Sequence, residues 1–194
     1  MATGIPTEFT ADGVLDVGTY EATIEQVRDS ILIRGPQDAD EIAWDVEHRL
    51  KLLGNAEVLI AQLRATGISE IFIDGSFAEA KPRPNDIDGY FECTIADLAS
   101  GDLARRLNGL DPHKIWTWDP AARKPGPGST KKQLPMWHRY RVEFYPHCRG
   151  LLSGIKDRFG NDQQFPAAFR QQRGSGLRKG IIKVVPSKAD GEAV

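Results

Sequence analysis

Two aspartates placed two residues apart are the feature of this chain that most directly suggests chemistry. Asp86 and Asp88 follow the turn-forming pair Pro84-Asn85, and residues 86–93 predict a β-strand. Because successive side chains of a strand point to opposite faces, both carboxylates share one face and repel each other. A divalent cation relieves this repulsion, and carboxylate oxygens suit Mg²⁺ or Mn²⁺. The spacing predicts a metal-binding pair, with a solvated Asp-rich turn as the alternative.

A Gly-Ser turn precedes these aspartates. The apolar residues 70–74 predict a strand that runs into Gly75 and Ser76, ten residues before the first aspartate. Glycine allows backbone amides to approach a ligand closely, and the serine adds a hydroxyl, so the turn predicts contacts with phosphate groups. Lys81 and Arg83 lie in the spacer. They are further candidates for binding a nucleotide, with solvent-exposed loop charges as the alternative.

The Gly-Ser turn, the spacer and the Asp-x-Asp pair resemble the signature of the nucleotidyltransferase superfamily that shares its catalytic fold with DNA polymerase β. The short stand-alone prokaryotic members are the most similar, and the resemblance is tightest from Ile71 to Glu92. Asp74 departs from the signature, which usually has an apolar residue before the turn. The resemblance implies a mixed sheet with an active site on its open face.

A third carboxylate is expected on a neighbouring strand, by analogy with two-metal phosphoryl-transfer sites. The alternating residues 139–145 predict a strand that carries Arg141 and Glu143 on its polar face. By resemblance, Glu143 occupies the position of the family's third acid, which is most often aspartate. Asp86, Asp88 and Glu143 are therefore the expected catalytic and metal-binding residues. The alternative for Glu143 is an ion pair with Arg141 or with a neighbouring strand.

The resemblance implies transfer of a nucleoside monophosphate from an NTP to an acceptor hydroxyl, with Mg²⁺ or Mn²⁺ as the cofactor. It also suggests a toxin–antitoxin or phage-defence setting, with tRNA or a partner protein as the acceptor. Two alternatives remain. One is a non-catalytic nucleotide- or RNA-binding module, and the other is a metal-dependent nuclease or phosphohydrolase that uses the same three acids.

Two basic segments favour a polyanionic substrate, although surface charge that aids solubility is the alternative for each residue alone. Trp116, Trp118 and Trp137 border the first segment, where core packing is favoured over base stacking. The segments contain Arg123, Lys124, Lys131 and Lys132, and then Arg170, Arg173, Arg178, Lys179 and Lys183.

The composition is that of a globular protein, with 194 residues, 40% hydrophobic and 27% charged residues. The net charge of −2 gives no overall attraction to nucleic acid. No apolar run approaches the ~20 residues that a membrane-spanning helix needs. Residues 1–12 lack the features of a signal peptide, and Cys93 and Cys148 are the only cysteines. These features predict a reduced, cytoplasmic protein without a membrane partner.

The pattern of elements predicts an α+β fold, a small mixed sheet with helices packed on one face. We expect an N-terminal arm (1–18), one nucleotidyltransferase-like domain (19–186) and a disordered tail (187–194). The expected helices run from Thr19 or Thr23 to Gly35-Pro36, from Asp38 to Gly67, from Thr94 to Asn108-Gly109 and over 164–172, and the further expected strands cover 115–118 and 181–185.

Overall fold

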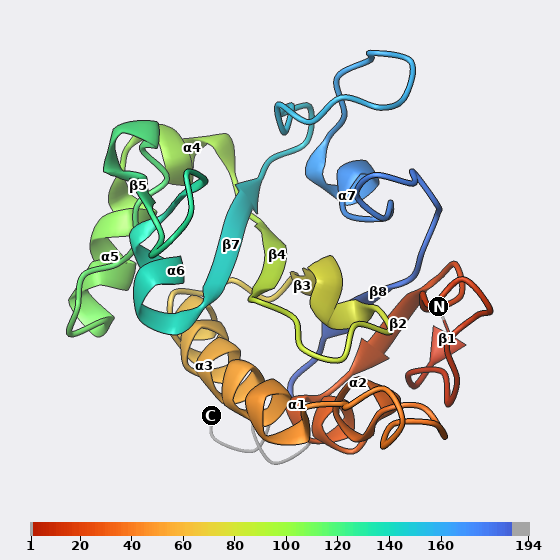
Figure 1. Ribbon diagram of the computed structural model, residues 1–194. Coiled ribbons are helices and arrows are strands. Elements are labelled where there is room, and N and C mark those ends of the chain that lie inside the picture. Colours follow the sequence, from red (N-terminus) through yellow and green to blue (C-terminus); the bar gives the residue numbers. More distant parts are fainter. Residues whose placement is uncertain (1, 188–194) are drawn as a thin grey trace.

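A six-stranded mixed sheet forms the centre of the computed structural model, which describes residues 2–187 (Figure 1). The third strand of the chain is antiparallel to both of its neighbours, and the other neighbouring strands pair in parallel. In spatial order the strands are β1 (Ala2–Thr3), β2 (Thr19–Ala22), β8 (Ile181–Val184), β3 (Ile71–Asp74), β4 (Ile87–Glu92) and β7 (Val142–His147).

The helices are short except for one of 20 residues. They are α1 (Ile24–Arg28), α2 (Ile31–Arg34), α3 (Val46–Ala65), α4 (Ile95–Ala99), α5 (Asp102–Leu110), α6 (Pro135–Tyr140) and α7 (Phe165–Ala168), with 3₁₀ turns at Gly75–Ala78 and Pro120–Ala122. A small hairpin is made by β5 (Lys124–Pro125) and β6 (Lys132–Gln133). The expected α+β class with a mixed sheet is confirmed.

The two faces of the sheet differ in what covers them. Ile73, Ile87 and Phe144 belong to the main hydrophobic core, which they share with the long helix α3 and its neighbours. Phe72 and Tyr90 point to the other face and form a second, smaller apolar cluster. The short helix α7 packs on that cluster, so the helices are not confined to one face as expected. The rest of this second face carries polar side chains.

The segment before β2 is part of the sheet. Ala2 and Thr3 pair in parallel with Tyr20 and Glu21, and Val14 forms an antiparallel bridge with Glu79. Both the edge strand β1 and the bridge were missed in the sequence. Residues 188–194, most of the expected tail, lie outside the described residues. Among the described helices, none is both long and apolar enough to cross a lipid bilayer.

The first helical region differs from the expectation in its start. Thr23 caps α1 with a reciprocal capping box, whereas Thr19 lies in β2. Ser30 then caps a second helix, so the expected single helix is divided in two before it ends at Gly35.

The long helix α3 begins after Asp45, seven residues later than expected. Asp38 accepts backbone bonds only from the turn that follows it, and Ala43 takes a left-handed φ of 54°, which a helix does not allow. The side chain of Asp45 accepts from the His48 amide and supplies the cap. The helix continues through Gly54 without a break.

Three later expectations were also wrong, in whole or in part. Residues 94–110 form α4 and α5 with a break at Gly101, where φ is 68°. Residues 115–118 form no strand, although Trp116 is buried in the core. Pro135 begins α6, which occupies the start of the expected strand 139–145 and delays β7 to Val142.

Arg49 on α3 ties the first half of the fold together. Its buried guanidinium donates to the backbone carbonyls of Leu32, Phe77 and Lys81. The same group lies over the rings of Trp44 and Phe77. Burial lowers the pKa of Arg49 to about 9, which still leaves it charged at neutral pH. One side chain thus fixes the 3₁₀ turn after β3 and the following loop against the helical layer.

Replacing Arg49 is expected to destabilise the fold. In Arg49→Met three carbonyls lose their donor, and the bonds to Leu32 and Phe77 are buried. A buried group left unsatisfied costs about 1–3 kcal/mol, so with the lost packing of the side chain we expect a total loss of about 3 kcal/mol or more in urea unfolding. Arg28→Met removes an exposed pair with Glu57 and is the matched control, with an expected change of ~1 kcal/mol at most. Equal losses in the two variants would contradict the role assigned to Arg49.

Candidate functional site

Three carboxylates stand side by side across three adjacent strands on the face opposite the main core. Asp74 of β3 pairs in register with Asp88 of β4, and Asp88 pairs with Glu143 of β7. We call these three residues the acidic row. Asp86 lies one step before β4 on the same side as Asp88, so the structure brings together all three acids that the sequence predicts.

Asp88 is the member of the acidic row that has neither a hydrogen-bond donor nor an ion pair among the described residues, whereas Asp74 pairs with Lys179 and Glu143 has two donors. Burial, followed by the charges of Asp86 and Glu143, raises the pKa of Asp88 to about 7. Lys131 and Arg173 act in the opposite direction. Because these cations only partly offset the repulsion, Asp88 is the position at which an added positive charge gains most.

The Gly-Ser turn lies directly against Asp88. Gly75 has a left-handed φ of 71°, and a Cβ added there would lie 2.9 Å from Asp88 Oδ2. A glycine is therefore required both by the turn and by the close approach. Ser76 is the second residue of the 3₁₀ turn and is partly exposed. The predicted phosphate contact and the aspartate pair thus lie next to each other.

The other two predicted acids are held by neighbours. The indole Nε1 of Trp137 donates to Asp86 Oδ2 over 2.7 Å. Glu143 Oε1 accepts from the backbone amide of Leu134 and Oε2 from the hydroxyl of Tyr145, both over 2.7 Å. The alternative for Glu143, an ion pair with Arg141, is not formed among the described residues, because Arg141 lies outside the strand and the cation near Glu143 is Arg123.

Asp74, which departs from the signature in the sequence, is a member of the acidic row that the sequence does not predict. It is fully buried, and Lys179 Nζ lies 3.0 Å from its Oδ1. Both oxygens lack a well-aligned hydrogen bond, so the contact is an ion pair. Burial raises the pKa of Asp74, and Lys179 opposes that shift. Lys179 also binds Glu79 Oε1 and the carbonyl of Gly75, which secures the turn.

The two basic residues of the spacer lie apart from the turn. Arg83 pairs with Asp45, and the side chain of Lys81 is exposed. Within the described residues no hydrogen bond or ion pair joins either side chain to Gly75 or Ser76. The prediction that they bind the same phosphates as the turn stays a prediction.

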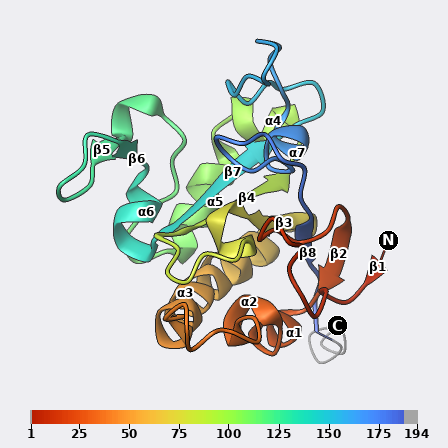
Figure 2. The same cartoon turned by 45° about the vertical axis from the view of Figure 1, so that its right-hand side comes forward.

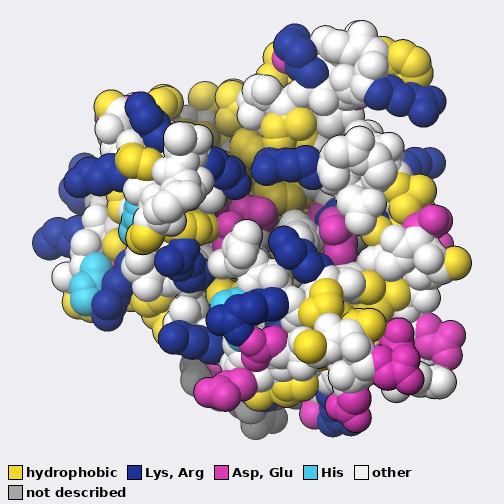
Figure 3. Space-filling model, in the orientation of Figure 1, with side chains coloured by type: hydrophobic (Ala, Val, Ile, Leu, Met, Phe, Trp, Pro, Cys, Tyr) yellow, Lys and Arg dark blue, Asp and Glu magenta, His cyan; other side chains and the backbone are white. Residues whose placement is uncertain are grey.

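Cations of the two basic segments surround the acidic row. Lys131 and Arg173 act on Asp88, and Arg123 lies 3.7 Å from Glu143. Figure 2 shows the β5–β6 hairpin with α6 on one side of β7 and the α7 segment on the other. Figure 3 shows acidic side chains at the floor of a central hollow, with Lys and Arg side chains around its rim. The arrangement suits a ligand that carries both phosphates and cations.

A pocket of about 430 Å³ opens beside Asp86. Trp137 and Arg141 form part of its wall, and the guanidinium carbon of Arg141 lies 3.8 Å from the centroid of the Trp137 indole. In the sequence, the feature that could indicate a role for Trp137 in this pocket is its position beside a basic loop. By contrast, Trp116 and Trp118 pack in or against the core.

A model described as a family of unknown function (DUF6932) matches residues 7–185. The chain belongs to this family. No curated protein matches the chain, and no solved structure matches it. The range that matches the DUF6932 model contains the whole acidic row, the Gly75 turn and the pocket.

The carboxylates of the site are compatible with Mg²⁺, which takes oxygen ligands. Within residues 2–187 no three His, Cys, Asp or Glu side chains converge as a ready-made metal cage. Mg²⁺ seldom uses such a cage, because it usually binds one or two carboxylates, several waters and the phosphates of its substrate. Asp86 and Asp88 supply that kind of partial site. Glu143 retains acceptor positions beyond the two already used.

The pKa of Asp88 makes the metal-free protein sensitive to pH. Its pKa is raised in the fold, so the folded state binds more protons than the unfolded state between about pH 4 and pH 7. Stability is therefore lost as the pH rises through this window. Asp88→Asn removes the charge, and we expect its melting temperature in EDTA to exceed that of the wild type by at least ~3 °C at pH 8, but not at pH 4.

Asp97→Asn is the matched control, because it reverses the sign. Hydrogen bonds from Thr94 hold the pKa of Asp97 below its usual range, so its charge stabilises the fold above that range. Asp97→Asn should lower the melting temperature at pH 8. A parallel shift of both variants at pH 8 would contradict the repulsion assigned to Asp88.

Proposed function

We propose that this protein is a metal-dependent nucleotidyltransferase that moves a nucleoside monophosphate from an NTP to an acceptor hydroxyl and releases pyrophosphate. The observation that carries the proposal is the position of Asp88. It lies in the middle of a row of carboxylates, has no hydrogen-bond donor among the described residues and touches the Gly75 turn. A phosphate-binding turn against an unneutralised carboxylate is a suitable site for a nucleotide–metal complex.

The order of the elements supports the proposal. The chain runs from β3 through the Gly75 turn into the antiparallel β4, and β7 lies in parallel beside β4. The resemblance to the polymerase-β-like superfamily implies a mixed sheet with acids from two neighbouring strands on one open face, and the observed sheet is consistent with that implication. Asp74 and its partner Lys179 are additions to that pattern.

The residues of the site have distinct roles in this reaction. Asp86 and Asp88 would hold the cation, which when bound neutralises charge on the triphosphate and orients it. In this proposal the amides and hydroxyl of Gly75-Ser76 would bind the phosphate tail. Glu143 is held in one orientation by Leu134 and Tyr145 and takes the proton of the acceptor hydroxyl. The fixed positions of these groups would supply most of the rate gain.

A second candidate is a nucleotide-binding module without turnover. It is favoured by one observation, the engagement of both Glu143 oxygens by neighbouring donors. A carboxylate with both oxygens hydrogen-bonded in this way can stabilise the fold without taking part in a reaction. The two candidates differ in product, because a binding module retains the intact NTP.

Label transfer tests the proposal. Purified protein is incubated with each α-³²P-labelled NTP, Mg²⁺ or Mn²⁺, and a lysate that contains RNA and protein. We expect a labelled RNA or protein band with the wild type. Asp86→Asn or Asp88→Asn should reduce it at least ~100-fold, because cation stabilisation of the transition state contributes several kcal/mol.

Glu92→Gln is the matched control, since Glu92 lies four residues beyond Asp88 on the same strand face and about 13 Å away along the strand. It should label the acceptor as the wild type does. Binding of intact NTP without labelling would support the binding module. Release of mononucleotides without NTP use would support a nuclease, and equal labelling by Asp88→Asn would sink the assignment.

A further inference from the structure

The pocket beside Asp86 opens at the start of β4, where residues 83–86 meet the β5–β6 hairpin and α6. Its volume of about 430 Å³ is in the range of small-ligand sites. Gly126 of the β5–β6 hairpin closes one side, since a Cβ there would lie 3.0 Å from the Trp137 ring. The pocket is lined by His48, Arg83, Asn85, Asp86, Lys131 and Arg141, among others.

The charge of this pocket is mainly positive. Its lining contains three cationic side chains, those of Arg83, Lys131 and Arg141. The lining contains one carboxylate, that of Asp86, whose Oδ2 already accepts a hydrogen bond from Trp137. Arg83 is paired with Asp45. Within residues 2–187, neither Lys131 nor Arg141 forms an ion pair with a carboxylate. Two cations are therefore available to an anion that enters the pocket.

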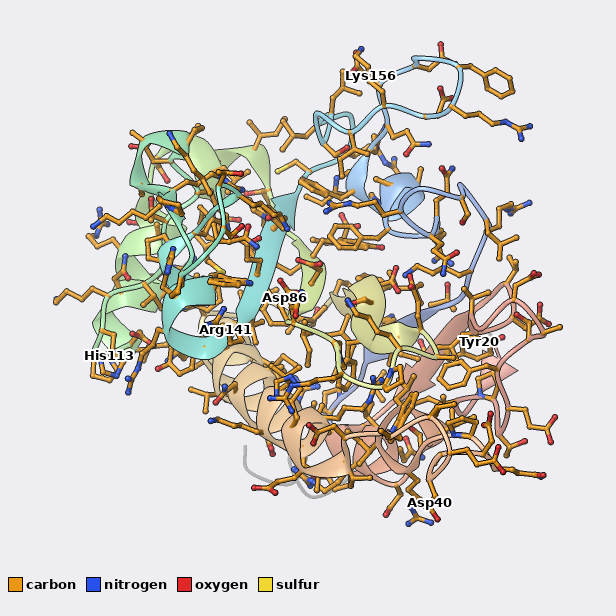
Figure 4. The ribbon with its side chains drawn as sticks, viewed as in Figure 1. Tyr20, Asp40, Asp86, His113, Arg141 and Lys156 are labelled. Atoms are coloured by element: carbon orange, nitrogen blue, oxygen red, sulfur yellow. The ribbon has the colours of Figure 1, made fainter. Side chains whose placement is uncertain are left out.

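Arg141 is held in an unusual backbone conformation. Its φ of 57° is in the left-handed region, which is uncommon for a residue other than glycine and is often associated with functional sites. The turn between α6 and β7 thereby places its guanidinium on the Trp137 indole, whose Nε1 binds Asp86. Figure 4 shows Arg141 and Asp86 near each other at the centre of the molecule. The face of the guanidinium that points away from the indole can stack on a base, and its N–H edge can bind a phosphate.

We propose that this pocket binds the terminal nucleotide of a single-stranded nucleic acid, the strand that accepts the transferred group. The inference rests on the proposed function. In phosphoryl transfer the attacking and leaving oxygens lie roughly in line, so the acceptor enters opposite the pyrophosphate. With the phosphate tail at Gly75 on the β3 side, the opposite side is that of Asp86, Gln133 and Trp137, where the pocket opens.

The surroundings favour a strand over a free nucleotide. Lys124 and Lys132 are exposed on the β5–β6 hairpin next to the pocket. Arg123 lies beneath that hairpin, with its guanidinium near Tyr145 and Glu143. These cations extend the positive surface beyond the volume of one nucleotide. A strand with several phosphates reaches these cations and forms ion pairs with them, whereas a single mononucleotide fills only the pocket.

The test is direct binding in EDTA, without NTP. The probe is a 5′-fluorescein-labelled RNA octamer of mixed sequence, followed by fluorescence anisotropy at low salt. We expect Arg141→Gln and Lys131→Gln each to weaken binding by about 10-fold or more. Arg139→Gln is the matched control for Arg141, because Arg139 is exposed and does not line the pocket. Lys131 is on an exposed loop, so its variant is informative even if Arg141→Gln fails to fold.

Several results would overturn the inference. One is binding of the octamer by both pocket variants as tightly as by the wild type. Another is displacement of the octamer by an equal concentration of AMP, which would assign the pocket to a free nucleotide. A DNA octamer that binds equally would support a site for strands of either sugar. Pocket-dependent binding without label transfer would keep the pocket as a strand-binding site but overturn the proposed function and, with it, the acceptor role of the strand. Label transfer without octamer binding would overturn the inference and leave the proposed function intact.

Discussion

Repulsion between buried carboxylates is the constraint around which the site is built. Strand pairing places Asp74, Asp88 and Glu143 next to one another, where little water remains to screen their charges. Two of them are compensated locally, by an ion pair with Lys179 and by two hydrogen-bond donors. Asp88 has neither, and the pKa of its carboxyl group is raised because burial and the neighbouring negative charges disfavour its ionised form. A fold rarely retains such a cost where a neutral side chain would fit, which gives the position its functional interest.

The compensating charges come from parts of the chain that are far from the acids in sequence. Lys179 lies about 100 residues after the turn that it secures, and Arg49 fixes the same turn from α3 on the other side. Lys131 and Arg173 approach Asp88 from two separate loops. The sheet therefore fixes the negative charges rigidly, whereas the cations nearest to Asp88 are carried by loops. A ligand with its own cation can replace that long-range compensation without a change in the sheet.

The sequence was most informative where the signal was local. Alternation and the two aspartates gave β3, β4 and the pair Asp86 and Asp88, because a strand determines which side chains share a face. Glu143 was found in the same way, although the strand begins later than expected. The role of Asp74 could not be found, since its partner is distant in sequence and appears only in the fold. Capping signals were ambiguous for the long helix, because Asp38 and Asp45 are both acceptable caps and the turn at Ala43 decided between them.

The same reasoning explains why the strand expected over 139–145 begins only at Val142. The first residues of that stretch are compatible with helix or strand, and Pro135 starts the helix α6, which continues to Tyr140 and leaves Arg141 outside the strand. The helix α6 ends in a left-handed residue, and the chain enters β7 with Glu143 already facing Asp88. The backbone feature that ends the helix thus positions an acid of the row and a cation of the pocket within three residues. Any change in the helix end would move both groups together, which couples the acidic row to the pocket beside it.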